Sequence, residues 1–575
     1  MRRRAPFAAR FSETGWIGTA ILALAAIIAL YLVIAPLGML FAAAFRGPQD
    51  ALPFEPGTQW TLANLAAVYA ERRLYTTVIP NTLIFVAGSV TLGFAAAFVL
   101  AWLVERTDLR ARGAVYAAVL FPLLVPGVVL GIAWTFLLGP HAGWINVALR
   151  ALLGLAGDGP LDIFSMAGLI LAQGAALVPF LFLLLGAALR TMNPALEEAS
   201  STAGAPPWAT FLRVTLPVLR PGILAPLILA SLIALEQFEM PLVIGLPARI
   251  DIFSTRIYYE LNPDTNLPAF GRAAAVALPF LAAAMLLLLA YNRAVRRAER
   301  FAIVAGKAYR PARLALGRWA APAWAFIALY LGFAVVLPAL VLLWTSLYGF
   351  AVPSLALLPR ASFQAYATLF ARADFFAALR NTFIVAGASA AIVTSLGALI
   401  AWTVLRSRLP GRALLDVLSI ISIGIPAVIA GLAVMLLYLS LPIGLYGTVW
   451  VLVLAYSYRL AVATRLSRAS LTQLHREHEE ASYVAGGQWL ATMGRVVLPL
   501  LRPTLTANFV LLFVIGVREF TLPTILASRD NPVLSVTMWN LFIANESGSA
   551  AAVGCLLVAC VAPVVVIARR LLPDT

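Results

Sequence analysis

Charged residues are scarce in this chain. Only 11% of its 575 residues are charged, whereas 62% are hydrophobic, and the mean hydropathy is +0.93. A soluble core of this size does not need so much apolar sequence, while each membrane span consumes about 20 apolar residues. The composition therefore excludes a water-soluble protein and predicts a membrane protein with many spans.

Lysine, cysteine and histidine are nearly absent. The only lysine, Lys307, is followed by alanine, so the chain cannot form the Gly-x4-Gly-Lys-Ser/Thr loop that binds ATP phosphates. Cys555 and Cys560 are typical of small apolar packing residues. His475 and His478 lie one helical turn apart, but no cysteine or third histidine is near them. We therefore expect no metal site, no bound cofactor and no catalytic residue, and a machine driven by ATP must take hydrolysis from another polypeptide.

Apolar segments long enough to cross a membrane occur six times in each half of the chain. The first follows Arg2, Arg3 and Arg4, as a signal peptide would, but its apolar run is too long for one, so we expect a retained anchor. The expected spans of the first half are 16–44, 81–104, 114–137, 166–188, 222–245 and 273–292. Those of the second half are 320–347, 382–405, 413–438, 444–464, 503–526 and 550–568.

The charges that do occur are sorted by side of the membrane. With the N-terminus inside, the inner segments hold 28 Lys and Arg against 11 Asp and Glu, and the outer segments hold 11 of each. An excess of basic residues in cytoplasmic loops is the positive-inside pattern of membrane proteins, so the net charge of +16 does not indicate nucleic-acid binding. We expect both termini in the cytoplasm, and we expect the basic segment 293–318 to lie on anionic lipid headgroups.

One polar segment occurs twice, 282 positions apart, and each copy lies between the fourth and fifth spans of its half. Each copy predicts a short helix, a left-handed glycine that ends it, and a second helix that ends near a Leu-Pro pair. A repeated polar bracket between apolar spans indicates a pair of docking elements that face the same solution. The matching residues are Glu198, Ala199, Gly204, Leu216 and Pro217 in the first copy, and Glu480, Ala481, Gly486, Leu498 and Pro499 in the second.

The duplication extends beyond this segment. Asn81 and Asn381, which we expect to start the second span of each half, match at an offset of 300, and so do Arg106 and Arg406. The offset then falls to 282, which places 18 extra residues in the first half, in an outer loop around 141–162. Because each repeat has an even number of spans, we expect a parallel repeat with its pseudo-two-fold axis along the membrane normal. We divide the chain into a first domain at 1–300, a linker at 301–318 and a second domain at 319–575.

The repeated segment resembles the signature of the inner-membrane permeases of binding-protein-dependent ABC importers. That signature is Glu-Ala-Ala, a glycine three residues later, and an aliphatic residue, any residue, Leu and Pro after a nine-residue gap; here Ser200 and Ser482 replace the second alanine. The resemblance covers essentially the whole chain. It implies the MetI-like fold: an all-α membrane protein with about twelve transmembrane helices in two parallel six-helix repeats. In the family, the bracket is the coupling helix that sits in a groove of the ATP-hydrolysing subunit.

The resemblance also implies partners and a location. Two brackets imply two copies of an ATP-binding subunit, which uses ATP and Mg on the cytoplasmic side. The outer loops are too short to capture a substrate, so a periplasmic or extracellular solute-binding protein is expected. The chain itself would be a transport permease of the bacterial inner membrane, not an enzyme, with lipid but no nucleic acid as a partner.

The fused layout most resembles the permeases of the iron(III), thiamine and aminoethylphosphonate importers, and the sequence Val-Arg-Glu-Phe at 517–520 favours the iron(III) branch. Thiamine, a polyamine and aminoethylphosphonate are alternative substrates. A further alternative is an ATP-independent secondary transporter with parallel repeats, which would not need a repeated bracket. A membrane enzyme would need a titratable cluster near a bilayer face, and the sequence shows none.

Charged residues in the fifth and eleventh spans are candidates for the translocation pathway. Glu236 and Glu239 lie in the outer half of one span, and Arg518 and Glu519 lie in the same part of the other. A charge within a span is costly and usually faces an aqueous cavity or a partner, so we expect these four residues at the outer mouth of a cavity on the pseudo-two-fold axis. Alternatively, Arg518 pairs with a carboxylate across the axis and fixes the packing. Carboxylate oxygens suit the passage of Fe(III), and they also tolerate cationic thiamine or a polyamine. Arg459, near the inner end of a span, is expected to reach the headgroups.

Overall fold

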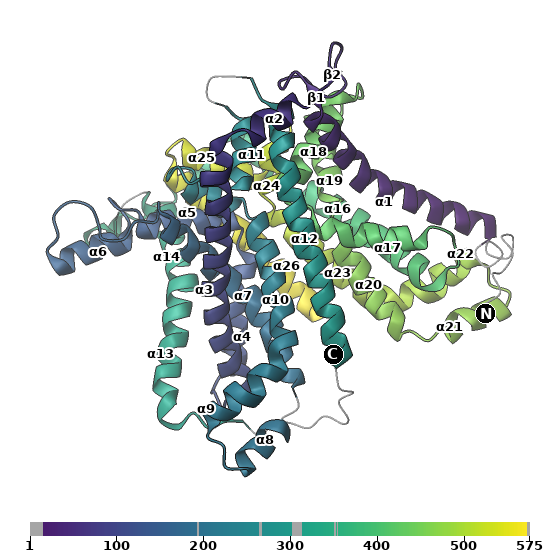
Figure 1. Cartoon of the computed structure of the whole chain (residues 1–575). Coiled ribbons are helices and arrows are strands. Elements are labelled where there is room, and N and C mark those ends of the chain that lie inside the picture. The colour runs from purple at the N-terminus through teal and green to yellow at the C-terminus, as the bar shows by residue number, and fades with distance from the viewer. Residues whose placement is uncertain are drawn as a thin grey trace.

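The computed structural model of the chain describes residues 15–192, 195–263, 267–301, 313–349, 352–353 and 355–571. The predicted positions of both termini, and most of the expected linker at 301–318, therefore concern residues outside the described part. Helices dominate the described residues (Figure 1). The strands among them are the short antiparallel pair β1 (Arg46–Gly47) and β2 (Gln59–Trp60).

Nine helical segments of the described residues are long and apolar enough to cross a membrane. Three bent helix pairs bring the number of spans to as many as twelve, so the prediction of an all-α membrane protein with about twelve spans is confirmed. In the first half, the nine segments contain α1 (Gly15–Ala44), α3 (Ile79–Arg106), α7 (Met166–Thr191), α10 (Leu216–Glu236) and α12 (Phe270–Phe301). In the second half, they contain α13 (Ala320–Leu331), η7 (Gly332–Val336) and α14 (Leu337–Tyr348), then α16 (Ala373–Arg406), α23 (Leu498–Arg518) and α26 (Ser547–Leu571).

The third span of each half is sharply bent. The bend is 100° in the first half and 112° in the second. It falls at Pro126 and Pro426, because a proline lacks an N–H donor and forces the preceding residue out of the helical conformation. The fourth span of the second half is also bent, by 48°, next to Arg459. The first bent span consists of α4 (Arg112–Leu120) and η3 (Phe121–Leu124) before the bend and α5 (Gly127–Leu138) after it. The matching span consists of α17 (Arg412–Ile421) and η9 (Ser422–Gly424) before the bend and α18 (Ala427–Ser440) after it. The third bent span consists of α19 (Val449–Tyr456) and α20 (Leu460–Gln473).

The fifth span of each half differs from the expected helix at both ends. α10 and α23 stop at Glu236 and Arg518, well before their expected ends. At the other end, the Leu-Pro pairs start these helices, whereas we expected them to end the preceding ones. A π-helical turn, η4 (Phe211–Thr215) or η10 (Met493–Val497), joins each span to its bracket, and such a turn is a common way to accommodate a break in the helical hydrogen bonds. The second helix of each bracket is therefore continuous with the fifth span.

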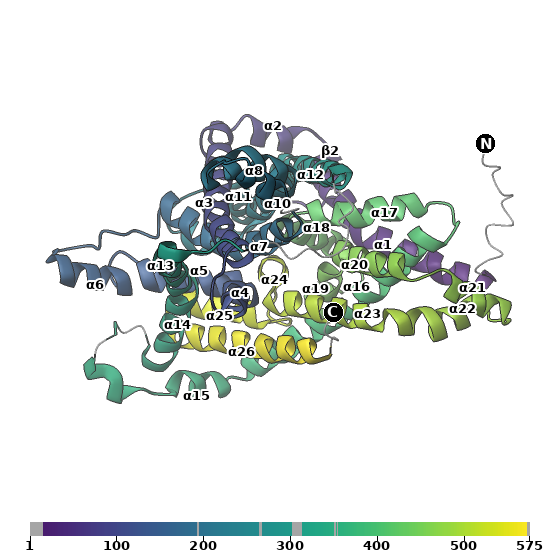
Figure 2. The same ribbon diagram turned by 90° about the horizontal axis from the view of Figure 1, so that it is seen from below.

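Shorter helices lie in the connecting loops. α6 lies within the predicted insertion at 141–162 and projects away from the helix bundle (Figures 1 and 2). Asn146, which is fully buried, holds this loop together because its amide donates to the carbonyls of Leu138 and Leu161. The short helices are α2 (Ala63–Tyr69), η2 (Leu74–Val78), α6 (Trp144–Leu153), η5 (Pro241–Gly245), α11 (Phe253–Leu261), η6 (Gly317–Trp319), η8 (Leu355–Arg360), α15 (Gln364–Phe370), α24 (Thr521–Leu526) and α25 (Leu534–Ile543).

Matching hydrogen bonds show that the two repeats share one architecture. Asn81 donates to the backbone carbonyl of Asp251 at 3.2 Å, and Asn381 donates to that of Pro532 at 3.0 Å. The helical backbone begins several residues before either asparagine, so the expectation that they are helix-start residues is wrong. Their amides instead hold the loop that follows the fifth span, in both halves.

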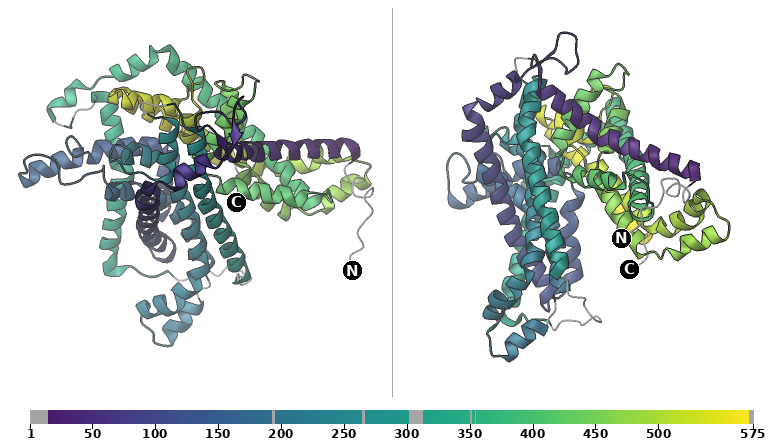
Figure 3. Two further views of the ribbon diagram at one scale, coloured as in Figure 1. Left: turned by 45° about the horizontal axis from the view of Figure 1, so that its top comes forward. Right: turned by 45° about the vertical axis from the view of Figure 1, so that its right-hand side comes forward.

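The first helix of each half, α1 or α13, packs against the opposite half, whereas α14, which continues the span from α13, packs against α26 of its own half. α1 contacts α16, α17 and α18 of the second half and runs beside them in Figure 3. α13 belongs to the apolar cluster of α3, α4 and α7 through Ala323, Ile327 and Tyr330, and Figure 2 shows it close to α4. The boundaries at 1–300 and 319–575 stay predictions, and α1 and α13, the first helices of the two predicted domains, are exchanged across them in the fold.

Candidate functional site: two brackets and the central contact

Each bracket is a pair of short helices at its own end of the molecule. The first bracket consists of α8 (Ala195–Thr202) and α9 (Pro207–Thr210), and the second of α21 (Glu477–Val484) and α22 (Trp489–Thr492). Figure 1 shows the two brackets well apart. Gly204 and Gly486 have φ angles of +82° and +84°, so the predicted left-handed turn is confirmed at both positions. A Cβ on either would meet no described atom within 4 Å, so glycine is required for its conformation and not for space.

The brackets expose the residues that the sequence singled out. Glu198 and Ala199 are exposed on α8, and Glu480 and Ala481 are exposed on α21. Of the residues in the Leu-Pro pairs, Leu216 is half-buried and Pro217, Leu498 and Pro499 are exposed. Exposed apolar side chains that gather in one place mark surfaces for a protein partner. Those on the brackets are Leu196, Trp208 and Leu212 in the first, and Tyr483, Val484 and Leu490 in the second.

A buried ion pair ties the first helix of each bracket to the second span of its half. Arg106, at the end of α3, pairs with Glu197 of α8. Arg406, at the end of α16, pairs with Glu479 of α21, with Nε and Oε1 3.3 Å apart. None of the four side chains is more than 20% exposed. Sequence reasoning found the matching arginines but missed their partners, although Glu197 and Glu479 also repeat, directly before the signature.

A pair of hydroxyl groups closes each bracket and accounts for the replaced alanine of the signature. Ser200 Oγ lies 2.9 Å from Thr210 Oγ1, and Ser482 Oγ lies 2.8 Å from Thr492 Oγ1. Each hydrogen bond joins the first helix of a bracket to the second. The serine is thus matched by a threonine on the facing helix, in both copies.

The two fifth spans meet at the centre of the molecule. Gln237 and Glu519 have an extended backbone, which ends α10 and α23. The residues that follow, Phe238 and Phe520, are fully buried and stack with their ring centroids 6.3 Å apart. Because the two phenylalanines occupy matching positions of the repeats, their contact lies on the pseudo-two-fold axis.

Arg459 points inward from the bend between α19 and α20. It forms an ion pair with Glu519, with Nη1 and Oε2 2.6 Å apart. The expectation that Arg459 reaches the lipid headgroups is therefore wrong, because the bend turns it onto a carboxylate that offsets the cost of its buried charge. Its neighbour Tyr458 donates to the carbonyl of Ile425 at 3.2 Å, which satisfies a backbone group at the bend of the ninth span.

Arg518 joins the two halves. Its Nη2 donates at 2.8 Å to the carbonyl oxygen of Val125, at the bend of the third span. Glu239 lies against Gly127, in the first turn of α5, where the helix dipole favours a carboxylate. Glu236 Oε1 is buried and accepts no hydrogen bond from the described residues. Arg518 thus bonds a backbone carbonyl of the opposite half, and it also interacts electrostatically with Glu239 of that half, as the packing alternative expects.

A small cavity lies beside Arg459. Its volume is about 10 Å³, which is room for about one water molecule. Residues of α16, α19 and α23 line it, together with Arg459. None of the four predicted pathway residues belongs to this lining, so a wider cavity at their level stays a prediction.

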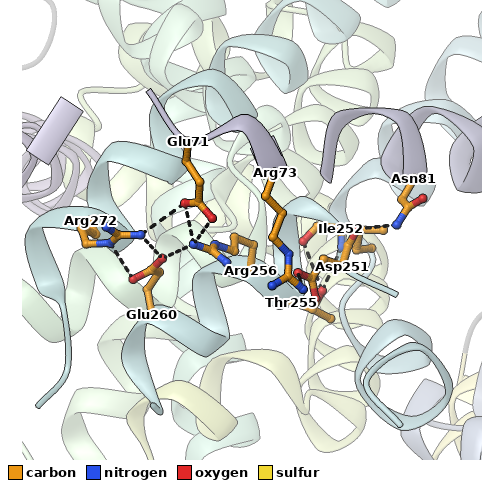
Figure 4. Close-up of polar contacts among 9 residues, drawn as sticks. All are labelled: Glu71, Arg73, Asn81, Asp251, Ile252, Thr255, Arg256, Glu260 and Arg272. Carbon is orange, nitrogen blue, oxygen red and sulfur yellow. Dashed lines mark hydrogen bonds and ion pairs between the residues drawn. The ribbon is translucent and has the colours of Figure 1, made fainter. Parts of the chain in front are cut away.

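A second polar cluster lies at the end of the first half that is opposite its bracket (Figures 1 and 4). Arg256 and Arg272 share the carboxylates of Glu71 and Glu260, with N–O distances between 2.8 and 3.3 Å. The four residues come from the loop before α3, from α11 and from α12, so they tie these elements together. Beside them lies a cleft of about 790 Å³.

Among the described residues of the second half, this end carries different ion pairs, which join Arg372 to Asp374 and to Glu546. The matching hydrogen bonds to Asp251 and Pro532 align the two repeats. In this alignment, Glu71, Arg256 and Glu260 correspond to Ala371, Thr537 and Leu541, none of which is charged. Sequence reasoning missed the ring because its members are spread over some 200 residues and no local pattern connects them.

Two segments of the chain, 90–300 and 393–575, match the family described as "binding-protein-dependent transport system inner membrane component". The chain is 27% identical over 510 residues to the ferric transport system permease protein FbpB of Actinobacillus pleuropneumoniae, which covers 87% of this chain and 71% of that protein. It is 23% identical over 457 residues to the Fe(3+)-transport system permease protein FbpB 2 of Haemophilus influenzae, which covers 79% of this chain and 80% of that protein.

Shorter similarities extend to other permeases. The chain is 37% identical over 146 residues to the molybdenum transport system permease protein ModB of Azotobacter vinelandii, which covers 25% of this chain and 62% of that protein. Among solved structures, a chain of a bacterial ABC transporter involved in the import of alginate is similar with a TM-score of 0.38 and 20% identity, over 50% of this chain and 96% of that chain.

Proposed function

Because the chain belongs to the family of inner-membrane components of binding-protein-dependent transport systems, we propose that it carries Fe(III), delivered by an external solute-binding protein, across the membrane. Family membership makes the chain the permease of an ABC importer, a membrane transport protein and not an enzyme. The observation that carries the iron proposal is the length of the similarity to ferric permeases, 87% and 79% of the chain, against 25% for the molybdenum permease.

The alternatives have less support. Thiamine, a polyamine and aminoethylphosphonate fit the fused layout, but the relatives that match most of the chain are ferric permeases. Family membership decides against an ATP-independent secondary transporter. The repeated bracket, which such a transporter would not need, agrees with this conclusion.

Two ATP-binding subunits, which use ATP and Mg, dock on the two brackets from the cytoplasmic side, where both termini also lie. The support for this proposal is the pair of exposed surfaces around Glu198 and Glu480, each with apolar side chains beside the signature residues. Gly204 and Gly486 set the angle between the two helices of each bracket, and therefore the shape that a partner meets.

The substrate passes along the pseudo-two-fold axis, between the broken fifth spans. The stacked Phe238 and Phe520 close this path, and Glu236 and Glu239 supply oxygen atoms next to it. Hard oxygen ligands suit a highly charged cation. Among the described residues, no three His, Cys, Asp or Glu side chains gather as a metal site. We infer that these two carboxylates are transient contacts for the passing cation.

The substrate is tested by uptake into proteoliposomes that contain the permease, its ATP-binding subunit and its solute-binding protein. We expect uptake of ⁵⁵Fe(III) that requires enclosed Mg·ATP and is displaced by unlabelled Fe(III) but not by thiamine. ATP-dependent uptake of thiamine without uptake of iron would overturn the iron proposal and leave the permease function intact.

The path is tested with the double variant Glu236→Gln, Glu239→Gln. We expect ⁵⁵Fe(III) uptake to fall at least tenfold while the ATP-binding subunit still co-purifies, because the amides keep the shape of the side chains but remove their ionisable carboxyl groups. Glu55→Gln, which changes an exposed carboxylate in the loop before α2, is the control. Unchanged uptake by the double variant would show that the two glutamates only support the packing.

A further inference from the structure

The first helix of each bracket lacks a continuous helical connection to a span. α9 and α22 run without a break into the fifth span. α8 instead lies between the extended Met192 and the left-handed Gly204, and α21 lies between the extended Leu474 and the left-handed Gly486. Side-chain contacts must therefore hold α8 and α21 in place.

The buried ion pair attaches these two helices to the second span. Glu479 pairs with Arg406 through one carboxylate oxygen and accepts the indole N–H of Trp402 at 3.1 Å with the other. Glu197 pairs with Arg106 at the matching position of the first half. Since both partners of Glu479 lie in the last two turns of α16, a movement of α21 must move the end of that helix.

The opposite end of the same two spans is attached to the loop behind the central phenylalanines. Thr82 Oγ1 of α3 accepts the N–H of Phe253 at 3.2 Å. Thr382 Oγ1 of α16 accepts the N–H of Leu534 at 2.9 Å. The neighbouring asparagines bind the same loops, so each loop is held twice by its span.

These loops in turn hold the breaks that carry the phenylalanines. Ser254 Oγ donates to the carbonyl of Gln237 at 2.8 Å, and Ser535 Oγ donates to the carbonyl of Glu519 at 2.8 Å. Gln237 and Glu519 are the residues directly before Phe238 and Phe520. A chain of contacts therefore runs from each bracket, along α3 or α16, to the central contact, and its ion pair, threonine and serine contacts occur at matching positions in both halves.

We propose that α3 and α16 are rods that carry the movement of the brackets to the Phe238–Phe520 contact. The ion pairs of Arg106 and Arg406 are the inner attachments, and Thr82 and Thr382 are the outer attachments. The proposal rests on the proposed function, because it needs an ATP-binding subunit that moves the brackets. A contact network alone does not demonstrate coupling, so the experiment measures coupling between the two ends of one rod.

The test removes the attachment at each end of α16 by a nearly isosteric substitution. Glu479→Gln keeps an acceptor for Trp402 but removes the ion pair, and Thr382→Val removes the acceptor of the Leu534 N–H. Proteoliposomes with Mg·ATP and ⁵⁵Fe(III) report the iron transported per ATP hydrolysed. We expect ATP hydrolysis within twofold of wild type and a ratio at least tenfold lower in each variant. Both substitutions interrupt the same chain of contacts. The iron transported per ATP hydrolysed should therefore be no lower in the double variant than in the more severe single variant.

The control is Thr403→Val, which removes a hydroxyl of the same helix that bonds only within it, to the Leu399 carbonyl at 2.7 Å; its ratio should equal that of wild type. An unchanged ratio in both test variants, or losses that multiply in the double variant, would overturn the proposal. So would loss of the co-purifying ATP-binding subunit in Glu479→Gln, which would place Glu479 in the docking surface.

If a second-half variant fails to reach the membrane, Glu197→Gln and Thr82→Val apply the same test to α3. Wild-type protein without any ATP-dependent uptake would contradict the proposed function instead, so the two failures are distinguishable.

Discussion

The two brackets share a signature but not their surroundings. Trp489 of the second bracket is 4% exposed and packs beneath α1, where a Cβ on Gly18 would lie 2.8 Å from its ring. Trp208, in the first bracket, is 64% exposed. α13, which holds the place of α1 in the second repeat, contacts α4 and leaves Trp208 uncovered. The repeat thus determines the backbone of a bracket, while the exchanged first spans determine which bracket is covered.

The two brackets therefore differ in how much they contribute to the stability of the fold, although both carry the docking signature. The second bracket is part of the folded core, since Trp489 belongs to a buried cluster with Leu22, Trp402 and Leu501. The ion pair of the first bracket and the hydrogen bond between its two helices lie within its own half. Loss of the tryptophan of the second bracket should therefore alter stability and docking together, whereas loss of the tryptophan of the first should alter docking alone.

The largest expected difference is between the two tryptophans. Trp489→Ala should lower the free energy of unfolding by about 3–5 kcal/mol, the usual cost of removing a buried tryptophan. Trp208→Ala should change it by less than about 0.5 kcal/mol, as at other surface positions, but should weaken recovery of the ATP-binding subunit. Thermal unfolding of the two purified variants, and the yield of co-purified subunit, measure both effects. Equal losses of stability would contradict the comparison.

The next largest effect concerns α1, the helix that covers Trp489 of the second bracket. Gly18→Leu should cost about 1–3 kcal/mol, because the added side chain must displace the ring of Trp489. Gly38→Leu is the matched control on the same helix, since a Cβ at Gly38 meets no described atom within 4 Å. Thermal unfolding of the two variants should differ clearly. If both unfold like wild type, α1 does not stabilise the second bracket.

A smaller effect is expected at the turn that both brackets share. Gly204→Val and Gly486→Val should each cost about 1–2 kcal/mol, because a side chain disfavours the left-handed conformation. Each should reduce recovery of the ATP-binding subunit without reducing the amount of permease in the membrane. Gly494→Ala, in the π-helical turn η10, where a Cβ also meets no described atom within 4 Å, is the control. Wild-type recovery and transport by Gly486→Val would exclude the coupling role.

Much of the fold could be predicted because its signals are local. Apolar length predicted the spans, and the repeated polar segment predicted two brackets with left-handed glycines. Pro126 and Pro426 were visible as a matching pair, but the size of their bend was not, because proline inside a membrane helix often causes only a kink. The π-helical turns before Leu216 and Leu498 have no sequence pattern of their own, so the continuity of bracket and span was missed.

The parts of the site that could not be predicted depend on pairs of residues far apart in the sequence. Arg459 looked like a residue near a span end, and only the fold brings it to Glu519, 60 positions away. The exchange of α1 and α13 likewise depends on how whole helices pack, and apolar spans give no signal for their neighbours. Glu197 and Glu479 are the exception, because their repetition next to the arginine repeat was available to sequence reasoning.

The smallest effect concerns the hydroxyl pairs, which the comparison predicts to be equal in the two brackets. Ser200→Ala and Ser482→Ala should each cost about 1 kcal/mol, the usual contribution of one hydrogen bond, because both pairs have nearly the same length. Thr210→Ala and Thr492→Ala should cost as much, and each double variant should cost less than the sum of its two single variants. Thermal unfolding of the six variants gives the coupling energy of each pair. A coupling in the second bracket alone would mean that the cover of α1, and not the serine, determines how tightly a bracket is closed.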